Sequence, residues 1–278
     1  MAEHTHVISR RDEKSQMSVA FPAYIWPANN DTWTPLFDTI AANPTVPFDI
    51  IVNPSNGPNG TVPSPVYVAS ISRLNNYTNT NIFGYVHSSF GTRNVTAIIS
   101  DISAYQAWTT YPNADIHVDG IFVDEAPTDL VYLDHMSTIY GHVKDTLTGS
   151  NTVWTNPGVP IDAAFYKVAD LVNAYENSYD DWINNNGSNA IPKEQHSKST
   201  VMIHSYDQND KKLSQATDNL AKAEYHSSFL TNDSTYNAFS PLLPLYAQKV
   251  ATSDCHRNSP VIGLCAVGLA VASFMWSK

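Results

Sequence analysis

Residues 117–127 read HVDGIFVDEAP, and this stretch carries the pattern from which the fold is predicted. Its central run, GIFV, is apolar at every position, as expected of a parallel strand that is buried on both faces. Two adjacent carboxylates, Asp124 and Glu125, end the run, and Pro127 follows, a residue favoured at the start of a helix. The stretch therefore predicts a buried strand that leads into a helix and leaves two acids at its carboxyl end.

Seven further apolar runs occur along the chain, at intervals that leave room for helices. Segments with helical spacing or helix start signals begin near Asp31, Ser64, Thr92, Asp129 and Asp210. Strands that alternate with helices indicate a parallel sheet, and eight such units predict a closed (β/α)8 TIM barrel in a single domain. An open doubly wound sheet is the competing fold, disfavoured because the chain has eight strands and no G-x-G-x-x-G motif. The predicted strands are residues 18–25, 48–53, 81–87, 119–124, 151–156, 170–176, 199–204 and 227–233.

We expect the barrel to occupy residues 18–251, with a polar segment at 1–17 and an apolar tail at 252–278. The first segment contains no apolar stretch of the kind found in a secretory signal. The stretch from Val261 to Trp276 is almost wholly apolar but shorter than the roughly 20 residues of a spanning helix. A short polar stretch precedes it, as in a lipid-anchor signal; a C-terminal core helix is the equally weighted alternative.

Composition narrows the class of partner and the compartment. The formal net charge of −11 argues against a nucleic-acid partner, which needs a basic surface. Two cysteines, Cys255 and Cys265, leave the main body without a disulfide framework. Six N-glycosylation sequons favour an extracellular or cell-surface glycoprotein, which we expect to be a monomer. Membrane attachment through the apolar tail is one of the two interpretations of that segment given above. The sequons begin at Asn30, Asn59, Asn76, Asn94, Asn186 and Asn232.

Aromatic, amide and imidazole side chains gather at the carboxyl ends of the predicted strands. In a parallel barrel these ends converge at one mouth, where active sites lie. The mixture suits a sugar, because aromatic faces stack on pyranose rings while amides and imidazoles bond their hydroxyls. We therefore expect a polysaccharide substrate, bound by Tyr24, Asn53, Tyr85, His87, Arg93, Asn156, Tyr175, His204, Tyr206 and Asn232.

Three acids at two strand ends, Asp124, Glu125 and Glu176, are the candidate catalytic residues. Two carboxylates over such a mouth can cleave a glycosidic bond: one protonates the leaving oxygen, and the other attacks the anomeric carbon or activates water. Capping of the following helix is an alternative for each acid taken alone. Side chains alternate along a strand, so at most one of the adjacent pair should face the barrel axis. Asp119, at the opposite end of its strand, is expected to be structural.

Other chemistries find less support. Asp124, Glu125, Glu176 and Asp207 are oxygen donors suited to a hard cation, yet no EF-hand loop or H-E-x-x-H motif is present. We therefore expect neither a metal nor a cofactor. The chain also lacks a G-x-S-x-G elbow and a Walker A motif. Whether the imidazoles at 87 and 204 act as general bases or as ligand contacts stays open.

Several motifs together carry a family resemblance. The segments PAYIWP, IIVNPSNGPNG, IFGYVHSSFGTR, VDGIFVDEAP, VWTNPG, NAYENSY, IHSY and FLTND occur in this order. Their combination resembles the spherulin-4-like family, also called spherulation-specific family 4, over roughly residues 18–250. Any one of these motifs alone would be weak; the combination is specific.

The resemblance implies a (β/α)8 barrel related to glycoside hydrolase family 135, whose characterised activity is endo-cleavage of α-1,4-linked N-acetylgalactosamine in galactosaminogalactan. It also implies that the essential acids are an Asp-Glu pair ending the fourth strand and a Glu ending the sixth. These positions match Asp124, Glu125 and Glu176. We expect Asp124 to be the nucleophile, Glu176 the general acid/base, and Glu125 a residue that holds substrate or tunes a neighbour's pKa. A non-catalytic, glycan-binding barrel of a cell wall or spore coat is the alternative.

Overall fold

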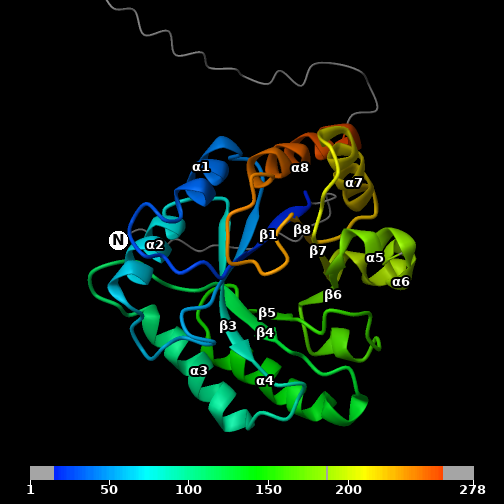
Figure 1. The fold of residues 1–278 in the computed structure, drawn as a ribbon. Helices are drawn as coiled ribbons and strands as arrows, with labels where there is room; N and C mark the ends of the chain where they lie inside the picture. Colours follow the sequence, from blue (N-terminus) through cyan, green and yellow to red (C-terminus); the bar gives the residue numbers. More distant parts are fainter. Residues whose placement is uncertain (1–15, 186, 259–278) are drawn as a thin grey trace, which may run out of the picture.

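Eight parallel strands close into a barrel in strict chain order, with the helices around it, in a computed structural model that describes residues 16–185 and 187–258 (Figure 1). The (β/α)8 prediction is therefore confirmed, and each predicted strand run overlaps an observed strand. The strands are β1 (Ser18–Ala23), β2 (Phe48–Val52), β3 (Thr80–His87), β4 (Gly120–Asp124), β5 (Thr152–Thr155), β6 (Leu171–Ser178), β7 (Ser199–His204) and β8 (Ser227–Leu230).

Helices follow most of the strands, and three 3-10 turns lie between them. The helices are α1 (Thr34–Ala42), α2 (Pro65–Asn75), α3 (Val95–Trp108), α4 (Leu133–Thr146), α5 (Tyr179–Asn184), α6 (Gly187–Ala190), α7 (Asp210–Lys222) and α8 (Leu243–Asn258). The 3-10 turns are η1 (Leu130–Tyr132), η2 (Phe165–Lys167) and η3 (Lys193–Lys198). No helix within the described ranges is long and apolar enough to cross a membrane. Most of the polar N-terminal segment, and residues 259–278 of the expected tail, lie outside those ranges.

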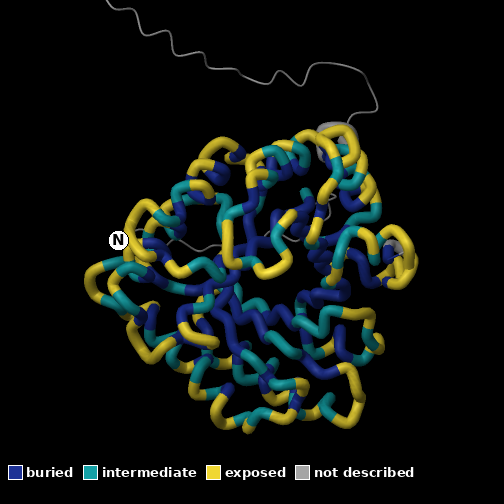
Figure 2. Tube along the Cα trace, in the orientation of Figure 1, coloured by how far each residue is buried: buried dark blue, intermediate teal, exposed yellow. Residues whose placement is uncertain are grey.

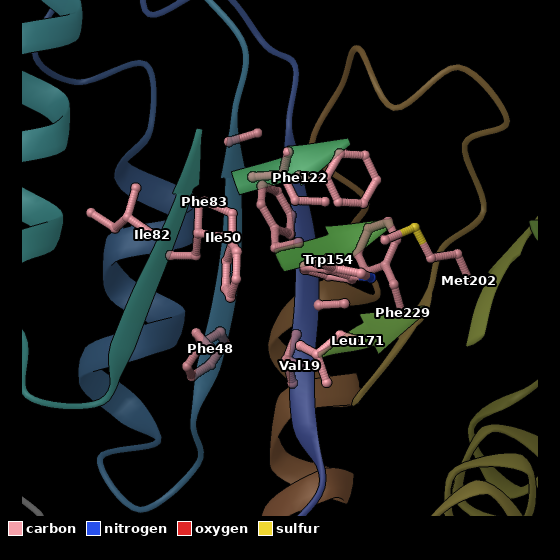
Figure 3. Packing of buried hydrophobic residues seen from close by; sticks show 14 of the residues in the cluster. Val19, Phe48, Ile50, Ile82, Phe83, Phe122, Trp154, Leu171, Met202 and Phe229 are labelled. Atoms are coloured by element: carbon pink, nitrogen blue, oxygen red, sulfur yellow. The ribbon is translucent and has the colours of Figure 1, made fainter. Parts of the chain in front are cut away.

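The interior of the barrel is filled by large apolar side chains rather than by a channel. Trp154 packs edge to face with Phe83 and Phe122, at ring-centroid distances of 5.2 and 5.0 Å (Figure 3). Phe21 packs edge to face with Phe229, with centroids 5.5 Å apart. These residues alternate along their strands with others that face the helices. Figure 2 shows the resulting buried centre within a more exposed periphery. The closely packed side chains of the interior therefore lie directly below the mouth of the barrel and support the residues there.

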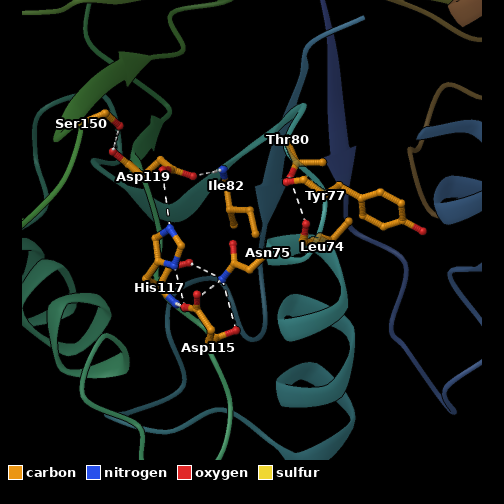
Figure 4. A network of polar contacts seen from close by, with 9 residues as sticks. All are labelled: Leu74, Asn75, Tyr77, Thr80, Ile82, Asp115, His117, Asp119 and Ser150. Atoms are coloured by element: carbon orange, nitrogen blue, oxygen red, sulfur yellow. Dashed lines mark hydrogen bonds and ion pairs between the residues drawn. The ribbon is translucent and has the colours of Figure 1, made fainter. Parts of the chain in front are cut away.

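A polar network at the amino end of the barrel explains Asp119. Its Oδ2 accepts a hydrogen bond from the backbone N–H of Ile82 at 2.7 Å, which ties the start of β4 to β3. His117 lies between Asp119 and Asp115, with Nδ1 2.6 Å from the Asp115 Oδ1 atom (Figure 4). Asn75 donates to the carbonyl of His117 at 3.2 Å, which links α2 to the network. Asp119 thus lies opposite the mouth in a structural role, as expected.

A bulge in β6 changes which side chains face the mouth. The pairing of β6 with β7 shifts register between Asn173 and Tyr175. In a regular strand, residues three apart face opposite sides of the sheet. A bulge inserts one extra residue, so two residues that are three apart across it face the same side. Asn173 and Glu176 consequently point into the barrel together, and Tyr175 points outward toward α5, where its hydroxyl donates to Asp181 at 2.7 Å.

Candidate active site

Asp124 ends β4 with its carboxylate directed into the mouth. It lies two residues after Phe122, on the same face of the strand, and therefore above the packed interior. Its Oδ2 accepts a hydrogen bond from the Tyr85 hydroxyl at 2.7 Å, and its Oδ1 accepts one from the Asn156 amide at 2.8 Å. Both oxygens thus accept hydrogen bonds, which suits an ionised carboxylate that acts only as an acceptor.

Asn156 connects this acid to the second one. Its Nδ2 atom also donates to the Oε2 of Glu176 at 2.9 Å, so one amide group bridges the two carboxylates. Because both oxygens bond the same nitrogen, at 2.8 and 2.9 Å, the Asp124 Oδ1 and Glu176 Oε2 atoms are at most about 5.7 Å apart. Asn173 fixes the orientation of the bridge, because its Nδ2 donates to the Asn156 Oδ1 at 2.8 Å.

Glu176 is held in place by the two amide side chains. Its Oε2 accepts from both Asn156 and Asn173, each at 2.9 Å. The raised pKa of Glu176 results first from burial, which disfavours the charged form; the negative charge of Asp124 adds to the rise, and the hydrogen bonds oppose it. A carboxyl group whose pKa is raised by burial and by a second carboxyl group beside it is suited to act as a general acid.

Two tyrosines complete the surroundings of the pair. Burial, followed by the charges of Asp124 and Glu176, holds the pKa of Tyr24 well above its usual range. Tyr236, on the connection between β8 and α8, packs against Tyr24 with ring centroids 6.5 Å apart. Its hydroxyl is enclosed and faces Glu176: burial, followed by the charge of Glu176 and a hydrogen-bond interaction with it, raises the pKa of Tyr236. Tyr24 and Tyr236 thus form one wall of the site.

Glu125 leaves the barrel axis at the turn after β4. Its φ of 50° lies in the left-handed region, and its side chain is 43% exposed. The Glu125 Oε2 lies 3.7 Å from the Nδ1 of His87, which also contacts the Ser89 hydroxyl at 3.1 Å. One acid of the adjacent pair therefore faces the axis, as expected from strand alternation, and the other lies at the rim with His87.

The remaining predicted binding residues make contacts of other kinds. Asn53 accepts from the backbone of Gly57, and Arg93 pairs with Asp101 at 2.7 Å. Tyr206 packs on Tyr179, with ring centroids 4.7 Å apart. Asn232 accepts from Ser240, and His204 contacts the Ser205 hydroxyl and the ring of Tyr236. Of the predicted set, Tyr24, Tyr85 and Asn156 are brought to the two acids, and none of the contacts found for Asn53, Arg93, Tyr175, Tyr206 or Asn232 involves those acids.

Two residues near the acids were absent from the sequence prediction. Asn173 had a signal: an amide inside the apolar run LVNAY must find partners when buried. Tyr236 had none, because it lies in a polar connection and reaches the site only through the path of that loop. Among residues 16–185 and 187–258, no group of three or more His, Cys, Asp or Glu side chains is arranged to hold a metal ion.

Comparison with known proteins identifies a similar curated sequence and a similar solved structure. The chain is 26% identical over 187 residues to Spherulin-4 of Physarum polycephalum, covering 65% of this chain. That match spans 52% of Spherulin-4, so the chain corresponds to about half the length of this curated relative. Among solved structures, Aspergillus clavatus Sph3 in complex with GalNAc matches with a TM-score of 0.78 and 28% identity, over 85% of this chain and 98% of Sph3.

More distant structures share the fold alone. A chitinase from Bacteroides thetaiotaomicron matches with a TM-score of 0.58 at 11% identity, over 86% of this chain and 96% of the chitinase. The family model for spherulation-specific family 4 matches residues 18–250, which include every strand of the barrel and all the residues of the site. The chain therefore belongs to the spherulation-specific family 4.

Proposed function

We propose that this protein is a glycoside hydrolase that cleaves within α-1,4-linked N-acetylgalactosamine or galactosamine polysaccharide, with retention of configuration. The observation that carries the proposal is the single amide of Asn156 that bridges Asp124 and Glu176. It limits the separation of their facing oxygens to at most about 5.7 Å, the sum of its 2.8 and 2.9 Å bonds. Retaining glycosidases separate their two carboxyl groups by roughly 5–5.5 Å, and inverting ones by roughly 6.5–9.5 Å.

The environments of the two acids support different roles. Glu176, whose pKa is raised by burial and by the charge of Asp124, keeps a proton and delivers it to the glycosidic oxygen as the bond breaks. Asp124 attacks the anomeric carbon, and the product of this step is a covalent glycosyl ester. The Glu176 carboxylate then removes a proton from water, which attacks the same carbon and releases Asp124.

The substrate class rests on similarity and on the chemistry of the mouth. Sph3, which is 28% identical, was solved in complex with GalNAc. Tyr24, Tyr85 and Tyr236 surround the acids here, and aromatic faces of this kind pack on the apolar side of a pyranose. We also propose, from the sequons, that the protein acts outside the cell.

The test is product release from a defined polymer. The purified full chain would be incubated with galactosaminogalactan and with its deacetylated form, and products would be sized by mass spectrometry. Asp124→Asn and Glu176→Gln are the matched controls, because each keeps the volume of the side chain and replaces its carboxyl group with an amide that neither attacks carbon nor transfers a proton. We expect oligosaccharides from the wild type and none from either variant. Binding without product from the wild type would instead identify a non-catalytic glycan-binding protein.

A further inference from the structure

Phe90 presents an aromatic ring to water at the rim of the mouth. Its exposed fraction is 63%, and no ring contact of Phe90 is found among the described residues. Trp26 provides a contrast, because it is also exposed but its ring packs edge-on against Tyr67, with centroids 5.3 Å apart. Phe90 therefore leaves a large apolar surface without an aromatic partner among the described residues.

The backbone at Phe90 adopts a conformation that a large side chain avoids. Ser89, Phe90 and Gly91 have φ values of 48°, 55° and 85°, so three consecutive residues lie in the left-handed region. Only the last of them is a glycine, for which this region is free of strain. Such strain persists where the surrounding structure imposes it, and it concentrates at ligand-binding sites.

The strained turn is bonded to the strand that carries the nucleophile. The backbone N–H of Phe90 donates to the carbonyl of Glu125 at 2.7 Å, and the Ser88 hydroxyl donates to the same carbonyl at 2.7 Å. The N–H of Ser88 donates to the carbonyl of Asp124 at 2.9 Å. The position of Phe90 is thus fixed relative to Asp124 by three hydrogen bonds.

The next connection adds two more exposed apolar side chains beside this turn. Gly91 packs directly against the ring of Tyr132, so closely that a Cβ atom at Gly91 would come within 2.6 Å of it. Leu130 and Val131, which precede that tyrosine in η1, are 49% and 73% exposed. We call Phe90, Leu130 and Val131, the exposed apolar residues of these two adjoining connections after β3 and β4, the apolar ridge.

We propose that the Phe90 ring is a stacking platform for a sugar unit of the polymer beyond the bond that is cleaved. The flat aromatic face suits the C–H face of a pyranose, and the aliphatic side chains of the ridge suit the methyl groups of N-acetyl substituents. This inference rests on the proposed function, since it requires a polysaccharide that extends beyond the sugar units bound at Asp124 and Glu176. It assigns the ridge a role in holding long substrates.

Binding can be measured separately from cleavage in an inactive background. Glu176→Gln protein would be compared with Glu176→Gln carrying Phe90→Ala, using galactosaminogalactan in affinity electrophoresis and N-acetylgalactosamine in calorimetry. Loss of the ring should weaken polymer binding about tenfold, the size expected for one stacked aromatic, and change monosaccharide binding far less. Phe90→Trp keeps a stacking face and should retain polymer affinity within about twofold.

Val62→Ala is the matched control. Val62 is an exposed apolar residue like Phe90, 48% exposed, but it lies on the connection after β2, where Trp108 of α3 donates to the Gly60 carbonyl at 3.2 Å. We expect no change in either affinity. Polymer binding that is equal with and without the Phe90 ring overturns this inference and leaves the hydrolase proposal intact. Polymer that the wild type neither binds nor cleaves overturns both.

Discussion

Asp124 and Glu176 are joined through a single amide group, because the Nδ2 atom of Asn156 donates to the first at 2.8 Å and to the second at 2.9 Å. An amide nitrogen has two hydrogens, so this contact uses its full donor capacity. Asn173 prevents the bridge from flipping by donating to its oxygen. The relative position of the two acids is therefore set by amides that belong to β6 and to the end of β5.

Asn156→Ala should lower kcat about 100-fold while leaving the protein folded. The change removes the donor common to both carboxylates, and small displacements of catalytic groups are costly. Steady-state kinetics and thermal melting would be measured together. Asn185→Ala is the control, because Asn185 is an exposed amide that bonds Asp181 on α5. Unchanged kcat in the Asn156 variant would show that the bridge does not position the acids.

Asp124→Asn and Glu176→Gln should each lower kcat by at least about 10³-fold, within the range of general acid–base and nucleophilic contributions. Glu125→Gln should act mainly on KM, because the Glu125 side chain lies at the rim, 3.7 Å from the ring of His87, with 43% of its surface exposed. The three variants would be compared by kcat and KM on the same polymer. A larger loss of kcat from the Glu125 change than from the Asp124 change would reverse their roles.

Tyr236→Phe should move the alkaline limb of the pH dependence of kcat/KM to higher pH. That limb reports loss of the proton from the general acid, and the hydroxyl of Tyr236 opposes the rise in the pKa of Glu176. Removing the hydroxyl therefore lets the pKa of Glu176 rise further. Tyr206→Phe is the control, since the Tyr206 hydroxyl donates to the Asn209 carbonyl and not to either acid. A limb that stays in place or moves to lower pH would exclude this effect.

His117 should make folding stability depend on pH. Its interactions with Asp119 and then Asp115 raise the pKa of His117 to about 9, while burial opposes them. The folded pKa lies above the ordinary value of about 6.5, so the stabilisation is complete below that pH and is lost as pH rises toward 9. Urea unfolding at pH 6 and pH 9 should show a smaller decrease for His117→Asn than for the wild type. Equal decreases would contradict the prediction.

The barrel was predictable because every strand is a short apolar run followed by polar residues, and this pattern depends only on local sequence. The same pattern identified Asp124, Glu176, Tyr85 and Asn156, since strand ends in a parallel barrel meet at one mouth. Glu125 and Asp119 also lie where strand alternation and position along the strand placed them.

The sequence carries no signal for features whose local geometry is decided by distant parts of the chain. Strand alternation by itself does not reveal the bulge in β6, which turns Tyr175 toward α5 and brings Asn173 beside Glu176. Tyr236 and Phe90 lie on connections whose paths depend on contacts with other strands. Their left-handed backbone conformations result from those contacts and have no signal in the local sequence.

The measurement that tests the central claim most directly is the configuration of the first product. Wild-type protein would be mixed with an α-1,4-linked N-acetylgalactosamine oligosaccharide, and the anomeric protons would be followed by NMR from the first minute. The close pairing of Asp124 and Glu176 predicts that the α-anomer appears first and that the β-anomer grows in later by mutarotation. Initial release of the β-anomer would contradict the assignment of these two carboxylates as nucleophile and acid.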